Sequence, residues 1–157
     1  MEDLKSAVDG FDITALIPSL GDLLEKLAPL MRLLVLAGPV ALLGFGLYYM
    51  FWAPKEANHR AGYRFHYGMS RVRVWRFTQR LAGLVYAPLG LVLTVVMGIL
   101  CIFFGNMEPP EMVWMAAKCI LWEAVLIAIA TLAINITVVV CYDGEGNRRK
   151  DFRDFKE

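Results

Sequence analysis

The chain has 157 residues, 58% of them hydrophobic, and its mean hydropathy is +0.52. An ordinary soluble domain is closer to half apolar, so this composition excludes that class and indicates an integral membrane protein. The formal net charge is only +1, a balance that conceals an acidic N-terminal end and strongly basic segments further along.

Residues 1–32 form an acidic segment, in which six acids and two lysines precede Arg32. Ser19 and Asp22 resemble a capping box, and leucines at helical spacing follow them. We predict a short amphipathic helix over residues 19–30 on the outer membrane surface. The alternative is an extension of the first transmembrane helix into solvent. The start of the chain lacks the basic and apolar pattern of a cleavable signal peptide.

Three apolar windows exceed the length of about 20 residues that a helix needs to cross a bilayer. The windows are 33–53, 81–105 and 119–141, and their only charged residue is Glu123. We therefore predict an all-α membrane protein with a three-helix module over residues 33–141.

The basic residues of the connecting segments predict the topology, because cationic loops stay in the cytoplasm. The 54–80 loop contains seven Lys or Arg residues, and the charged tail, residues 142–157, contains five. The 106–112 turn contains none. The expected arrangement is a multi-pass plasma-membrane protein with its N-terminus outside and its C-terminus in the cytoplasm.

Small residues indicate how the helices pack. Gly83 and Gly90 lie seven residues apart, on one helical face, which predicts close packing within the chain; a homo-oligomer is the alternative. The third span, which we expect to begin near Met112, has a stripe of small and polar residues that should face the other two helices or a polar crevice. The stripe contains Ala116, Glu123, Ala130, Ala133 and Thr137, flanked by Ala124, Ala128, Thr131 and Asn135.

Glu123 is the one ionisable residue inside an apolar window. A charged carboxylate there costs at least ~2.5 kcal/mol unless it is paired or hydrated, which makes Glu123 a candidate functional residue. Lys118 lies roughly 140° away on an ideal helix, which disfavours a pair between them. The intramembrane polar residues Glu123, Thr131, Asn135 and Thr137 are thus either functional or structural.

No catalytic, cofactor or metal site is predicted. The sequence has no Ser/His/Asp or Cys/His arrangement and no phosphate-binding glycine loop, so we expect a protein that is not an enzyme. Three cysteines (Cys101, Cys119, Cys141) lie within or at the ends of the apolar windows, as packing residues would.

The basic loop suggests a lipid partner. Arg64 and Arg80 could hold lipid phosphates or bond to helix-end carbonyls, and anionic headgroups are the expected partners of loop 54–80. Direct nucleic-acid binding is disfavoured, because the loop is short and tethered to the bilayer. Asn58 is interpreted as a turn residue, and Ser70 as the N-cap of a helix that runs into the second window.

The order and spacing of polar and aromatic residues in this loop resemble the signature of the SdpI family of small bacterial membrane proteins. That signature has an Asn, a Gly-x-Arg shortly after it, and a Trp eleven residues after the Arg. The matching residues here are Asn58, Gly62, Tyr63, Arg64, Ser70, Trp75, Arg80 and Gly83. Departures include Phe65-His66 where the family often has Thr-Pro, and Gln79 where His or Asn is usual.

The resemblance implies a three-helix module in a bacterial plasma membrane. It also implies immunity to, or sensing of, a secreted membrane-active peptide, with signalling to a cytoplasmic partner. An alternative is a small accessory or assembly subunit of a larger membrane transporter complex. A lipid or small-molecule carrier that uses Glu123 is a third possibility.

Overall fold

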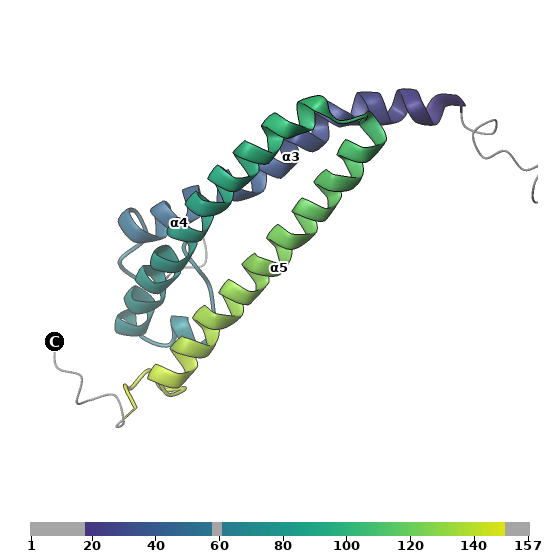
Figure 1. Ribbon diagram of the computed structural model, residues 1–157. Helices are drawn as coiled ribbons and strands as arrows, with labels where there is room; N and C mark the ends of the chain where they lie inside the picture. Colours follow the sequence, from purple (N-terminus) through teal and green to yellow (C-terminus); the bar gives the residue numbers. More distant parts are fainter. Residues whose placement is uncertain (1–17, 58–60, 150–157) are drawn as a thin grey trace, which may run out of the picture.

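The computed structural model of the protein describes residues 18–57 and 61–149, although the side chains of residues 18–22 and of Leu24 lie outside this description. The long helices are α3 (Pro18–Phe51), α4 (Val72–Phe103) and α5 (Pro109–Cys141), and the short 3₁₀-helices are η1 (Tyr67–Met69) and η2 (Phe104–Asn106). Helix α4 runs back along α3, and α5 then runs in the direction of α3 (Figure 1). The connection from α4 to α5 lies at one end of the bundle, here called the turn end. The α3–α4 loop and the segment after α5 lie at the other, here called the loop end.

All three long helices are long and apolar enough to cross a membrane, which confirms the three predicted spans. The candidate spans are Glu25–Phe51, Val72–Asn106 and Pro109–Cys141. Each begins earlier than its apolar window in the sequence. The reason is that helical hydrogen bonds propagate cooperatively through flanking polar residues that a hydropathy window leaves out.

The segment predicted as a separate amphipathic helix forms the first turns of α3. Residues 18–51 form one continuous helix, so a separate helix over 19–30 is not seen and the alternative, an extended first helix, is the arrangement found. Its start projects beyond the turn end of the other two helices (Figure 1). The predicted capping box depends on the side chains of Ser19 and Asp22, which lie outside the described residues.

Glycines bring α3 and α4 into close contact. A Cβ on Gly46 would lie 2.6 Å from Ala87 Cα, and a Cβ on Gly90 would lie 2.7 Å from Leu43 Cα. A Cβ on Gly83 would lie 2.9 Å from the Met50 backbone nitrogen. A larger residue at these positions would push the backbones apart, so glycine permits this approach. The prediction that Gly83 and Gly90 serve packing within the chain is confirmed.

The core lies between the three helices and is completed at each end by large side chains. Phe104 and Met112 are buried at the turn end, and Trp75 and Val138 at the loop end. The opposite faces of the helices expose many aliphatic side chains, which a bilayer would cover. Examples of these exposed side chains are Leu91, Ile99, Leu121 and Ile129.

Candidate functional site

The α3–α4 loop is fixed to the start of α4 by Gly62 and Trp75. Gly62 has a φ of +103°, a backbone conformation that glycine adopts without strain. A Cβ at this position would also lie 2.7 Å from Trp75 Cζ2. The buried Trp75 indole N–H donates a hydrogen bond to the Pro54 carbonyl, 2.7 Å away. The chain thus passes over the indole ring where only glycine fits.

Gln79 makes a reciprocal pair with the backbone of Tyr63. The Tyr63 N–H donates to Gln79 Oε1, and Gln79 Nε2 donates to the Tyr63 carbonyl, both at 2.8 Å. Gln79 is 2% exposed, and its amide satisfies two backbone groups that burial would otherwise leave without partners. In the sequence alone, Gln79 is visible only as a departure from the family pattern. The signal for its role was a polar residue one turn after Trp75, on a helix about to enter an apolar span.

Three tyrosines and two polar residues connect the loop to all three helices. The rings of Tyr49, Tyr63 and Tyr86 lie 6.0–6.3 Å apart, measured between ring centres. The Tyr63 hydroxyl donates to Asn135 Oδ1 at 2.7 Å, and the hydroxyls of Tyr86 and Thr131 are also 2.7 Å apart. Burial, with help from Tyr86, raises the pKa of Tyr63, so its hydroxyl remains a donor at neutral pH. Asn135 of α5 therefore holds the loop, and Thr131 of α5 bonds to α4.

Other predicted loop residues have different positions. The N-cap of α4 is Arg71, in an extended conformation, and not Ser70. Ser70 is instead the C-terminal cap of η1. Its hydroxyl donates to the Tyr67 carbonyl at 2.8 Å, which stabilises the end of η1. Arg64 and Arg80 are exposed. Asn58 lies outside the described residues.

The segment after α5 forms a turn that contacts the start of α4. The backbones of Tyr142 and Arg148 form an isolated antiparallel β-bridge. Gly146, between them, has a φ of +76°. A Cβ on Gly146 would lie 2.8 Å from Ser70 Oγ. Backbone N–H groups, that of Asn147 first, lower the pKa of Asp143, whose carboxylate accepts them. The loop and the start of the tail therefore lie at the same end of the bundle.

The predicted stripe on α5 is only partly buried. Ala116 and Glu123 face the core, Thr131 and Asn135 make the contacts above, and Ala133 is exposed. Thr137 donates to the Ala133 carbonyl of its own helix, in an exposed contact. The bulkier Ile134 and Val138 are buried in place of Ala133 and Thr137. These two positions were therefore predicted wrongly.

Glu123 lies buried between α5 and α3. It is 4% exposed, and its Oε1 has no hydrogen-bond partner among the described residues. Its Oε2 would lie 2.8 Å from a Cβ on Gly38, so the carboxylate packs against α3 at a position without a side chain. Lys118 lies over the Trp114 ring, 5.4 Å from its centre. This placement agrees with the expectation that Lys118 does not pair with Glu123.

Arg32 is the basic residue closest to this region in α3. Its Nη2 donates to the Phe104 carbonyl at 2.9 Å, a favourable contact at the C-terminal end of α4. Its Nε is buried without a partner among the described residues. Gly38 lies six residues, or about 9 Å, further along α3. Within the described part of the chain, Arg32 Nε and Glu123 Oε1 thus have no hydrogen-bond partner in the turn half of the bundle.

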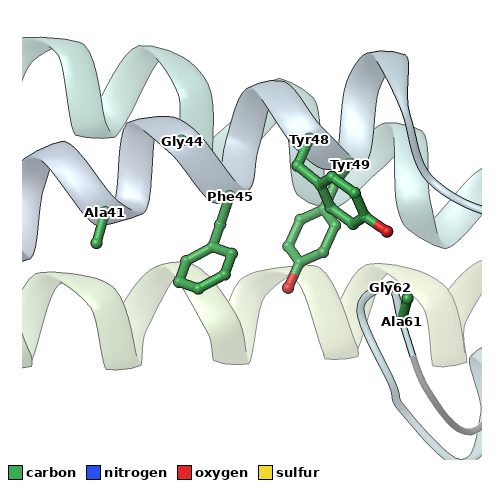
Figure 2. Close-up of a pocket in the computed structure, with 7 residues that line it drawn as sticks. All are labelled: Ala41, Gly44, Phe45, Tyr48, Tyr49, Ala61 and Gly62. Atoms are coloured by element: carbon green, nitrogen blue, oxygen red, sulfur yellow. The ribbon is translucent and has the colours of Figure 1, made fainter.

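A groove follows α3 towards the loop end. It has a volume of about 540 Å³ and is lined by residues of α3 and by Ala61 and Gly62 of the loop. Phe45 and Tyr49 point from α3 towards α5 across this space, and the loop closes its end (Figure 2). Gly44 also lines it, and a Cβ there would meet no atom within 4 Å. Gly44 therefore leaves space that the rest of the chain does not fill.

These features define a class: a multi-pass α-helical membrane protein in which Trp75 and Gln79 of α4 hold the interhelical loop at Pro54, Gly62 and Tyr63. The chain belongs to the SdpI/YfhL protein family, whose sequence profile matches residues 55–143. The matched segment includes most of the α3–α4 loop and the whole of α4 and α5. No curated protein matches the chain, and no solved structure matches it. The suspected family membership is confirmed.

Proposed function

We propose that this protein is a non-enzymatic membrane protein that gives its cell immunity to, or senses, a secreted membrane-active peptide. Family membership supports this proposal, because the resemblance to the SdpI family implies a role of this kind. The cell would be a bacterium, and the protein would lie in its plasma membrane. The peptide would arrive from outside and meet the turn end of the bundle.

The observation that carries the proposal is the unsatisfied Glu123 carboxylate. An ionised carboxylate in the membrane interior costs at least about 2.5 kcal/mol, and this one has a buried oxygen without a partner among the described residues. Such a group destabilises the protein unless it takes up a proton or something binds it. A cationic or hydrogen-bond-donating group of a membrane-inserted peptide would supply the missing partner.

The proposed orientation places the turn end outside. Exposed basic residues gather at the loop end, both in the loop and in the tail turn that docks against α4. These include Lys55, Arg71, Arg73, Arg76, Arg80, Arg148 and Arg149. Cationic segments remain on the cytoplasmic side, so the loop end would be cytoplasmic.

Deletion of the gene followed by a peptide challenge tests the proposal. Cells that lack the gene should die at concentrations of the secreted peptide fraction that wild-type cells survive, and a plasmid copy should restore survival. Survival that is unchanged by deletion, over the full range of peptide concentration, would refute the immunity role.

A second candidate function is an accessory or assembly subunit of a larger membrane complex. The groove beside Gly44 favours this alternative, because small residues on a lipid-facing helix let a partner helix approach. Purification in mild detergent separates the two functions. A larger membrane protein in stoichiometric amount would support the subunit, and its absence would support the immunity protein.

A further inference from the structure

A small basic cavity lies where the end of α3 meets α4, on the loop end of the bundle. It has a volume of about 330 Å³. Three of its nine lining residues are basic, and none of these nine is acidic. The lining residues are Tyr49, Met50, Phe51, Ala53, Pro54, Lys55, Arg76, Gln79 and Arg80.

Hydrogen bonds hold the turn after α3, which includes Lys55, against the start of α4, which includes Arg76 and Arg80. Trp75 Nε1 donates to the Pro54 carbonyl at 2.7 Å, and Arg76 Nε donates to the Lys55 carbonyl at 3.1 Å. These bonds tie the turn after α3 to α4. Arg80 lies four residues after Arg76, on the same face of α4. The three positive charges are therefore brought together by the fold, and their mutual repulsion favours an anion among them.

The polar amide in the cavity wall is not available to this anion. Both atoms of the Gln79 amide are already paired with the Tyr63 backbone. The three cationic side chains remain as the donors. Guanidinium groups match phosphate oxygens in geometry, and an ammonium group adds a point charge. The cavity therefore suits a phosphate group.

The position of the cavity indicates a phosphate attached to a lipid. The cavity lies at the end of the Glu25–Phe51 span, and Met50 and Phe51 form part of its wall. Phe51 and Trp52 are 67% and 71% exposed beside it, as side chains at a membrane interface are. A soluble anion would gain nothing from these apolar surfaces, whereas the glycerol and acyl chains of a lipid would cover them.

We propose that this cavity binds the headgroup of one anionic phospholipid, with Lys55, Arg76 and Arg80 around the phosphate. Its acyl chains lie along the exposed apolar side chains at the end of α3. The bound lipid links the end of α3 to the start of α4. This site is independent of the peptide function proposed above.

A second group of basic residues supplies a charge-matched control. Arg71, Arg73 and Arg148 line a different cavity with residues of the tail turn. Arg73 lies seven residues before Arg80, which places it about 10 Å further from the membrane along α4. Electrostatic attraction to a membrane surface acts on both groups, but only the first has an apolar wall at the end of a span.

The experiment measures lipid binding to the full chain by native mass spectrometry in detergent. The probes are phosphatidylglycerol, phosphatidylethanolamine and inorganic phosphate. Three proteins are compared: the wild type, Lys55→Gln/Arg80→Gln, and Arg71→Gln/Arg73→Gln. Both double variants lose two positive charges. Arg76 is left unchanged because it bonds to the backbone of the turn. Circular dichroism checks that each variant is folded.

The wild type should bind one phosphatidylglycerol molecule more tightly than phosphatidylethanolamine. Lys55→Gln/Arg80→Gln should lower this affinity about tenfold or more, and Arg71→Gln/Arg73→Gln by less than about threefold. Equal losses in the two variants would overturn the proposal, because they would show attraction by loop charge alone. Competition by inorganic phosphate at concentrations similar to those of the lipid would also overturn it, since it would indicate a site for a soluble anion.

Discussion

Gly44 and Gly46 lie two residues apart in α3 and form a matched pair for testing how closely α3 packs on α4. A Cβ at Gly46 would lie 2.6 Å from Ala87 Cα and 2.7 Å from the Tyr86 carbonyl carbon, both backbone atoms of α4. A Cβ at Gly44 would meet no atom within 4 Å. Gly46→Ala therefore forces the two helices apart, whereas Gly44→Ala leaves them in place.

The size of the effect follows from two contributions to the free energy of unfolding. Alanine is favoured over glycine in a helix interior by about 1 kcal/mol, and both substitutions gain this contribution. Overpacking of a well-packed interior destabilises by about 1–3 kcal/mol, and only Gly46→Ala adds it. Gly44→Ala should thus stabilise the protein by up to about 1 kcal/mol. Gly46→Ala should be about 1–3 kcal/mol less stable than Gly44→Ala.

The assay is unfolding by SDS in mixed micelles, followed by circular dichroism. Gly98→Ala is a second control, because a Cβ at Gly98 on α4 also meets no atom within 4 Å. Gly46→Ala should unfold at a lower SDS fraction than the other two variants. Equal midpoints for Gly44→Ala and Gly46→Ala would refute the reasoning, because the common helix-propensity contribution cancels in that comparison.

Two further predictions concern the loop end. Gln79→Leu should destabilise the protein by about 1–3 kcal/mol for each Tyr63 backbone group left unpaired, as measured by the same unfolding assay, and wild-type stability would contradict the reciprocal pair. The tail turn should loosen in acid, because the pKa of Asp143 is lower in the folded protein than in the unfolded chain. The resulting stability is present above the unfolded pKa of about 4 and is lost as the pH falls through the folded pKa. The Asn147 amide resonance should titrate with a midpoint below that of an unfolded Asp, and Asp143→Asn should abolish this titration; a midpoint at or above the unfolded value would contradict it.

Hydropathy was sufficient to predict three spans, but it could not place where the helices begin. The first apolar window lacks charges, whereas α3 includes Glu25, Lys26 and Arg32 before it. Helix continuation depends on backbone hydrogen bonds, which charged side chains do not interrupt. The same limitation led to the expectation of a separate amphipathic helix over residues 19–30.

The spacing of loop residues predicted the family, but the physical reason for that spacing required the fold. Gly62 and Trp75 are thirteen residues apart, and their contact depends on the path of the intervening chain. Tyr63 and Asn135 are separated by 72 residues. A single sequence contains no information about which of several polar residues on α5 such a tyrosine will reach.

The prediction that the small residues of α5 face the other helices was wrong towards the loop end, where the packing differs. Small residues suit a close helix contact, and Ala116 is such a contact near the turn end. Towards the loop end, α5 packs against the loop and the start of α4, where Val138 forms a cluster with Val74 and Tyr142. The buried position there is Val138 and not its neighbour Thr137.

The central claim is that the unsatisfied Glu123 carboxylate takes part in immunity to a membrane-active peptide. The most direct measurement is survival of the deletion strain carrying wild type, Glu123→Gln or Glu111→Gln under challenge with the secreted peptide fraction. Glu111, exposed in the first turn of the same helix, is the matched control. With equal amounts of each protein in the membrane, we predict that wild type and Glu111→Gln restore survival and Glu123→Gln does not. Full protection by Glu123→Gln would contradict the account.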